Sequence, residues 1–207
     1  MADRPLLKDA LDWIYARVAG DISASAVPGG SEADIDHWIR LAYTQAGAAG
    51  FVTNLGGVLT LPISLPANFI GTTAVQMRMI AKIAAARGYD VQSDEVKAFV
   101  LACMLGNAAV DALKDAGVRV GMRLAPAVLQ RLNQTVLTRL LARLGAMGAV
   151  NLTKVVPLLG GVIGGGLDAA STRVVGRMAK RVFVRKDVPA LPPAPAPKLL
   201  TGPEAQA

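Results

Sequence analysis

The sequence predicts an all-α fold, a single-domain helical bundle, and three observations lead to this class. Apolar residues recur at spacings of three and four along most of the chain, the period of a helix with one buried face. Residues that cap helices stand before several of these stretches. No stretch alternates polar and apolar residues for long enough to form a convincing strand. With 207 residues, 53% of them hydrophobic, the chain is long enough for one sizeable core.

The amino-terminal part contains several predicted helices. The opening MADRPLLKDALDWIYARV mixes acids and bases from its third residue, so it indicates an amphipathic helix rather than a secretory signal. Ser31 followed by Asp34 resembles a capping box with Asp in place of Glu, and Ser93 stands as a cap before first-turn acids. Pro66 suits the first position of a helix that Gly88 would end with a left-handed cap.

The carboxy-terminal part begins with an amphipathic helix after Pro126. Its apolar residues predict one buried stripe: Val128, Leu129, Leu132, Val136, Leu137, Leu140, Leu141 and Leu144. From Asp187 onward the last 21 residues include six prolines and no periodic apolar face, which predicts a disordered or polyproline tail. We therefore divide the chain into a helical domain, 1–186, and a Pro-rich tail, 187–207.

The stretch GGVIGGG, residues 160–166, does not fit a phosphate-binding loop, because Leu167 and Asp168 follow where a lysine or hydroxyl would be needed. Read as helix, its small residues form two adjacent rows that would allow another helix to approach closely. The predicted packing seam consists of Gly160, Gly161, Gly164, Gly165 and Ala169. Asp168 and Thr172, one turn apart, are expected to form a hydrogen-bonded pair or a solvated edge.

Residues 41–77 contain no charged side chain over 37 consecutive positions. This length allows a membrane span, or a re-entrant or interfacial hairpin that turns at Pro62 and Pro66. The third interpretation is two core helices covered by the rest of the domain. The residues alone leave the three alternatives open.

Charge is distributed unevenly along the chain. Residues 119–186 hold twelve basic side chains against one acidic side chain, a net charge of +11, whereas residues 1–118 hold nine against twelve, or −3. This division points to a polyanionic partner. On a helical wheel the cations of the last predicted helix share one face, which would suit anionic lipid: Arg173, Arg177, Lys180 and Arg181.

The sequence gives little support for catalysis or metal binding. His37 and Cys103 are the single histidine and the single cysteine, so neither an internal disulfide nor a His/Cys metal cluster can form. We interpret His37 as a solvated side chain and Cys103 as a buried small hydrophobe. No catalytic residue, cofactor or metal site is predicted. Residues 119–182 lack aromatic side chains, which argues against binding of single-stranded nucleic acid by stacking.

Two blocks of the sequence resemble the EcsC family of bacterial proteins. They are GGVLTLPISLPANFIGTTAVQMRMIAKIAAARGYDVQSDEVKAFVLACMLG and VVPLLGGVIGGGLDAASTRVVGRMAKRVF, which lie within residues 50–184. The shared pattern is a proline pair, a Gly-Tyr-Asp turn before an acidic helix start, and a glycine-rich terminal helix. The resemblance implies a helical domain that works at or beside a membrane, and it implies no activity.

From these observations we expect a non-enzymatic helical protein on the cytoplasmic face of the membrane. It would bind anionic phospholipid through the basic face of its last helix and insert the uncharged 41–77 hairpin. The alternative is a soluble helical module whose glycine seam forms a homo-oligomer or holds a partner helix.

Overall fold

The computed structural model describes residues 4–25, 29–55, 67–119, 124–151 and 157–186, and the side chains of 5–25, 29–49, 69–119, 124–143 and 164–186. The prediction of an all-α fold is confirmed, since the described residues form helices and no strand. The elements are α1 (Arg4–Ala24), α2 (Glu32–Leu55), α3 (Ala67–Ala86), α4 (Asp94–Cys103), η1 (Gly106–Ala108), α5 (Ala109–Asp115), α6 (Pro126–Asn151), α7 (Pro157–Ala179) and η2 (Lys180–Arg185).

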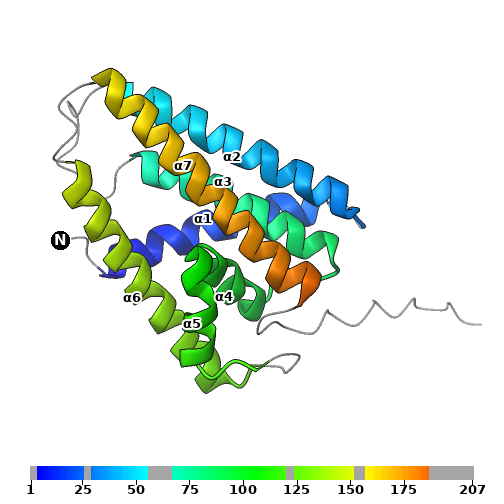
Figure 1. The fold of residues 1–207 in the computed structure, drawn as a ribbon. Helices are drawn as coiled ribbons and strands as arrows, with labels where there is room; N and C mark the ends of the chain where they lie inside the picture. Colours follow the sequence, from blue (N-terminus) through cyan, green and yellow to red (C-terminus); the bar gives the residue numbers. More distant parts are fainter. Residues whose placement is uncertain (1–3, 26–28, 56–66, 120–123, 152–156, 187–207) are drawn as a thin grey trace, which may run out of the picture.

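Helices α2 and α7 pack side by side in opposite directions and share the most extensive contact in the fold (Figure 1). A Cβ atom placed on Gly176 would lie 2.7 Å from Cγ2 of Ile39, near the start of α2. A Cβ atom placed on Gly47, farther along α2, would lie 3.2 Å from the Cβ of Ala169. The contacts therefore run backward along α7 as they run forward along α2.

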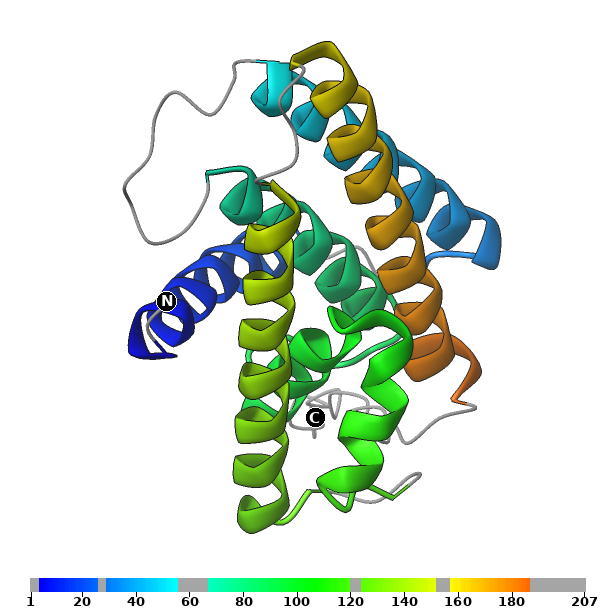
Figure 2. The same ribbon diagram turned by 60° about the vertical axis from the view of Figure 1, so that its left-hand side comes forward.

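Helix α3 lies against this pair and runs roughly parallel to α7. The Nε2 of Gln76 lies 3.0 Å from the Oγ1 of Thr172, and one turn later Met79 approaches Gly176. Helix α1 packs on α3, and α6 packs across α4, α5 and α1 (Figure 2). The Tyr15 hydroxyl of α1 donates to the carbonyl oxygen of Val91 at 2.9 Å, which ties α1 to the turn before α4.

The predicted helix ends are confirmed where the structure describes them. The Ser31 backbone N–H donates to the Asp34 carboxylate at 2.8 Å, and the Asp34 N–H donates back to the Ser31 hydroxyl at 3.2 Å, which is a reciprocal capping box. Ser93 accepts from the N–H of Val96. Gly88 has φ of +79°, the left-handed conformation that ends α3.

The core is formed by apolar side chains from every long helix. The largest fully buried side chains are Phe99, Phe183, Leu7, Ile35, Met77, Ile80, Ile83, Leu113, Leu132, Met178, Val100 and Val136. The stripe predicted on α6 faces this core, because Leu132, Val136 and Leu140 are buried. Phe183 and Tyr89 meet edge to face, with ring centroids 5.1 Å apart, so η2 closes the core next to the end of α3.

The uncharged residues 41–77 contribute to two helices, α2 and α3, that contact each other. Pro62 and Pro66, the predicted hairpin turn, lie outside the described residues, as does the predicted tail from Asp187. Ala42 and Ala46 on α2 and Met77 on α3 are buried in the core. Within the described residues, no helix is both long enough and apolar enough to be a candidate membrane span.

Candidate functional site

The four cations predicted to share one face differ in exposure. Arg173 and Arg177 are exposed on α7, Arg181 is half-buried in η2, and Lys180 is buried. The guanidinium carbon of Arg173 lies 6.0 Å from the centre of the Tyr43 ring on α2, within the range of a cation–π contact. Arg173 and Arg177 are therefore the two members of this set that α7 presents outward.

Lys180 does not join the exposed basic face. Its Nζ lies 2.7 Å from the carboxylate of Asp36 and 3.5 Å from that of Glu32, both in the first turns of α2. The helical wheel placed Lys180 beside Arg173, but a wheel takes no account of the helix packed alongside. Because α2 begins next to the end of α7, its acids reach this side chain and enclose it.

The predicted glycine seam lies in α7, where Gly164 and Gly165 are buried. The carbonyl oxygen of Gly165 would lie 3.3 Å from a Cβ atom on Gly47, so α2 of the same chain fills the groove beside Gly165 and Ala169. Gly160 and Gly161 belong to the first turns of α7, where side-chain surroundings are not described. A methyl group at Gly47 would fit only if its neighbours on α7 shifted by a few tenths of an ångström.

Four helices bring uncharged ends to the same end of the molecule, which we call the uncharged end. It consists of residues 41–55 of α2, 67–77 of α3, 144–151 of α6 and 157–167 of α7, none of which is Asp, Glu, Lys, Arg or His. The antiparallel packing of α2 and the parallel packing of α3 on α7 require this arrangement, and Figures 1 and 2 show it from two sides. The feature belongs to the fold, because these segments are far apart in the sequence.

Each of the four helices carries an arginine near the uncharged end. We call this set the arginine collar: Arg40 on α2, Arg78 on α3, Arg143 on α6 and Arg173 on α7. On α2, α3 and α6 the arginine is the charged residue nearest to the uncharged segment, whereas on α7 Asp168 comes first. Arg78 forms an ion pair with Asp21 of α1, and Nη1 of Arg143 donates to the carbonyl oxygen of Met104 at 2.9 Å.

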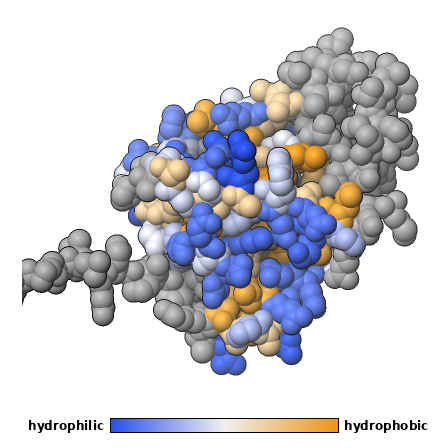
Figure 3. All heavy atoms as spheres, turned by 180° about the vertical axis from the view of Figure 1, so that it is seen from behind, coloured by the Kyte–Doolittle hydropathy of each residue, from blue (hydrophilic) through white to orange (hydrophobic). Residues whose placement is uncertain are grey.

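Large apolar side chains are exposed near this end. Leu41 is 49% exposed, Ile70 is 37% exposed and Leu167 is 55% exposed, and they lie on α2, α3 and α7 respectively. Figure 3 shows the molecule from behind, with orange apolar atoms along the border of the grey region at the upper right. A further orange patch lies lower in this view, and blue polar atoms cover much of the described surface between the two. The border of the uncharged end is thus both apolar and arginine-rich.

A buried polar layer lies between α3 and α7, below the uncharged end. The Nε2 of Gln76 donates to the hydroxyl oxygens of Thr172, at 3.0 Å, and Ser171, at 3.3 Å. Thr172 is fully buried, so it pairs with Gln76 across the helices and does not form a solvated edge with Asp168. This buried polar layer could have been predicted from the sequence, since Gln76 is a polar residue on the buried face of a helix.

Asp168 lies close enough to Arg143 to influence it. Burial lowers the pKa of the Arg143 guanidinium, and the negative charge of Asp168 acts in the opposite direction. Arg143 connects α6 both to the turn after α4, through Met104, and to α7. Asp168 is therefore part of the border of the uncharged end.

The described residues offer no cluster of three or more His, Cys, Asp or Glu side chains that could hold a metal ion. Cys103 is fully buried in α4, as its apolar neighbours predict, and burial raises the pKa of its thiol well above the usual range. His37 is exposed on α2.

Comparison with known proteins identifies the family. The model of the EcsC protein family matches residues 31–185, from the capping box of α2 to the end of η2. No curated protein and no solved structure matches the chain. The match covers the four helices of the uncharged end and includes the two blocks whose resemblance was noted in the sequence. The chain belongs to the EcsC protein family.

Proposed function

We propose that this protein associates with a membrane by setting its uncharged end against an anionic bilayer. The observation that carries the proposal is the convergence of four uncharged helix ends, with an arginine as the nearest charged residue on α2, α3 and α6 and with Arg173 after Asp168 on α7. In this orientation the exposed Leu41, Ile70 and Leu167 contact the boundary between head groups and acyl chains. Arg78 and Arg173 lie about two helical turns farther from the bilayer centre than Ile70 and Leu167, among the phosphates, whereas Arg40 directly precedes Leu41 at the boundary itself.

The proposal differs from the one suggested by the helical wheel alone. Arg173 and Arg177 remain lipid-facing candidates, whereas Lys180 takes no part because Asp36 and Glu32 hold it. The use of the glycine seam for a homo-oligomer finds no support in the packing at Gly165 and Ala169, where α2 occupies the groove. The membrane interpretation therefore depends on the end of the bundle rather than on one helix face.

Flotation of the purified protein with vesicles tests the proposal. We expect binding to vesicles that contain phosphatidylglycerol and much weaker binding to phosphatidylcholine alone. Each cation near an anionic surface contributes about 1 kcal/mol, so the Arg40→Ala/Arg173→Ala variant should bind about 30-fold more weakly. Raising the salt concentration should also release the wild-type protein, because exposed charges are screened.

The matched control is the Arg119→Ala/Arg131→Ala variant, which removes two exposed arginines outside the collar and gives the same net charge. We expect it to bind nearly as well as the wild type. Equal losses in both variants would mean that binding follows overall charge, and the proposed orientation would be wrong. Loss of binding in Leu167→Asp, with the fold intact, would support the apolar part of the contact.

A further inference from the structure

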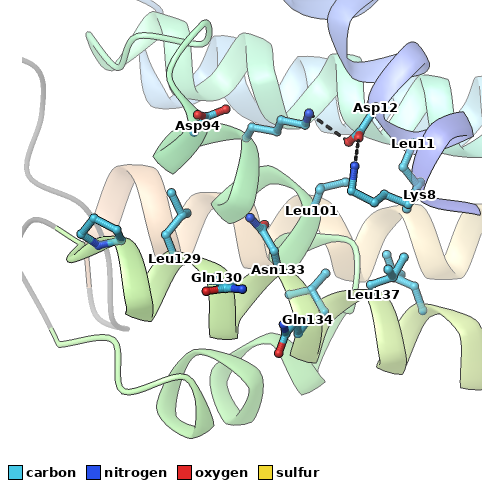
Figure 4. Close-up of a pocket in the computed structure, with 14 residues that line it drawn as sticks. Lys8, Leu11, Asp12, Asp94, Leu101, Leu129, Gln130, Asn133, Gln134 and Leu137 are labelled. Carbon is cyan, nitrogen blue, oxygen red and sulfur yellow. Dashed lines mark hydrogen bonds and ion pairs between the residues drawn. The ribbon is translucent and has the colours of Figure 1, made fainter. Parts of the chain in front are cut away.

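A groove separate from the uncharged end lies between α1, α4 and the first half of α6 (Figure 4). Its volume is about 540 Å³. The apolar side chains that line it are Leu11, Leu101, Leu129, Val136, Leu137 and Leu140. Leu11, Val136 and Leu140 are almost fully buried and form its floor, whereas Leu129 and Leu137 are half-buried. Burial of a ligand's apolar groups here would remove these side chains from water.

The charged wall of the groove is already neutralised. Asp12 of α1 binds the Nζ of Lys8 at 2.7 Å and the Nζ of Lys97 at 2.9 Å, as the dashed lines in Figure 4 show. Asp94 is the fourth charged residue of the lining, so two cations face two carboxylates. A strongly charged ligand would have to compete with these ion pairs, and the groove therefore favours an uncharged one.

The opposite wall carries side-chain amides. Gln130, Asn133 and Gln134 of α6 line the groove, and each offers two N–H donors and a carbonyl acceptor. Amides next to leucines are suited to a peptide that has apolar side chains and backbone carbonyls without hydrogen-bond partners. A proline-rich segment has this chemistry, since proline lacks the backbone N–H and an extended polyproline strand leaves its carbonyls unpaired.

The chain itself contains such a segment. Residues 188–197, VPALPPAPAP, include five prolines, one leucine and no charge. They follow η2 almost directly, and Phe183 of η2 packs on Tyr89, just before the turn that leads to Asp94 at the edge of the groove. At about 3.1 Å per residue, ten extended residues span roughly 30 Å, about twice the length of a ten-residue helix such as α4. An extended segment of this length can therefore run along the whole of α4, the helix that forms one wall of the groove.

We propose that residues 188–197 bind in the groove between α1, α4 and α6 of the same chain. The leucine of the segment, Leu191, contacts the leucine floor, and the amides of α6 donate to its carbonyl oxygens. This proposal does not depend on membrane association, because the groove and the uncharged end share no residue.

Disulfide trapping in the full-length protein tests the proposal. In a Cys103→Ala background, Ala194→Cys is combined with Gln134→Cys, at the edge of the groove. The matched control combines Ala194→Cys with Gln92→Cys, an exposed position in the turn beside Tyr89, where the tail begins. A tail without a preferred site would react at least as fast with position 92 as with position 134. The same tail links position 194 to both positions, and position 92 lies beside Tyr89, near the point where the tail begins.

We expect the pair at 134 and 194 to form its disulfide at least tenfold faster than the pair at 92 and 194. Leu191→Asp should abolish this advantage, because the groove has no partner for another carboxylate. A synthetic VPALPPAPAP peptide at millimolar concentration should slow the reaction at position 134 only. Equal or slower trapping at position 134 would overturn the proposal, and it would leave the vesicle experiment unaffected.

Discussion

Lys180 brings a positive charge into the contact between α2 and α7, where its side chain is 11% exposed. Its stem is buried, and its ammonium group is held by Asp36 and Glu32, which are themselves more than half exposed. An ion pair with one buried partner contributes more than a surface pair, although solvent still screens the carboxylates.

We expect Lys180→Ala to lower the free energy of unfolding by about 1 to 2 kcal/mol, through loss of both packing and charge pairing. Lys180→Met keeps the packing of the stem and should cost less than half as much. Denaturant titration of both variants measures this difference. If Lys180→Ala unfolds at the same denaturant concentration as the wild type, the ion pairs contribute nothing to stability. Neither variant should lose vesicle binding.

Cys103 lies in the interior of α4 and is fully buried. Burial raises the pKa of its thiol, so at pH 8 the folded protein contains almost no thiolate, the species that reacts with disulfide reagents. We expect the native protein to react with such a reagent at least 100-fold more slowly than the unfolded chain. Gln92→Cys in the Cys103→Ala background is the exposed control and should react rapidly without denaturant.

The same burial has a consequence at alkaline pH. The unfolded thiol loses its proton near pH 8.5, whereas the folded thiol keeps it, so stability declines as pH rises above that value. Replacing Cys103 with Ala should weaken this decline. Rapid labelling of native Cys103, or an unchanged alkaline decline in the variant, would contradict its placement in the core.

At the scale of helices, the contact between α2 and α7 depends on glycine at particular positions. Gly176 has no room for a methyl group, because its Cβ would lie 2.7 Å and 2.9 Å from two carbons of Ile39 and 3.2 Å from the sulfur of Met79. Ile39 is buried and β-branched, so its preferred rotamer in a helix leaves it little freedom to move aside. Gly166, in the same helix, is exposed and has open space around it.

We expect Gly176→Ala to destabilise the protein by about 1 to 3 kcal/mol, because overpacking outweighs the better helix propensity of alanine. Gly166→Ala should instead stabilise it by about 0.5 to 1 kcal/mol. Thermal unfolding of the two variants compares the same substitution at two positions of α7. Similar shifts in both would show that propensity, not the contact with Ile39, governs this helix.

The helix ends were predictable because their signals are local. Ser31 and Asp34 are three residues apart, and the positive φ of Gly88 follows from the stop of a helical pattern. The break between α4 and α5 was not predicted. There Gly106 adopts φ of +61° and its α-carbon faces Val174 of α7. A local sequence pattern cannot predict this contact.

The candidate site was predictable only in part, because only some of its features are local in the sequence. The uncharged 41–77 segment and its bordering Arg40 and Arg78 can be read directly from the sequence. That residues 144–151 and 157–167 join the same end depends on the direction in which α6 and α7 pack, which periodicity does not encode. Lys180 was misplaced because its exposure depends on acids 144 and 148 residues away.

At the scale of the whole molecule, the uneven charge of the sequence is partly cancelled by folding. Arg139 of the basic half pairs with Asp115 of α5 at 2.6 Å, and Lys180 pairs with Asp36 of α2 at 2.7 Å. Acids of the amino-terminal half therefore balance part of the net charge of +11 over residues 119–186. Among the residues that the structure describes, the charged side chains are separated from the four uncharged helix ends that meet at one end of the fold.

This separation predicts one orientation on a bilayer, which single-tryptophan proteins can measure. The native Trp13 and Trp38 are first replaced by Phe, and one tryptophan is then introduced by Leu167→Trp, near the uncharged end, or by Lys114→Trp. Lys114 is exposed on α5, which lies far from the uncharged ends of α2 and α7 in both ribbon views. Because indole emission shifts to shorter wavelength as its surroundings become apolar, anionic vesicles should shift the emission of the Leu167→Trp protein and protect it from acrylamide quenching. The Lys114→Trp protein should show neither change, and equal shifts at the two positions would contradict a single orientation.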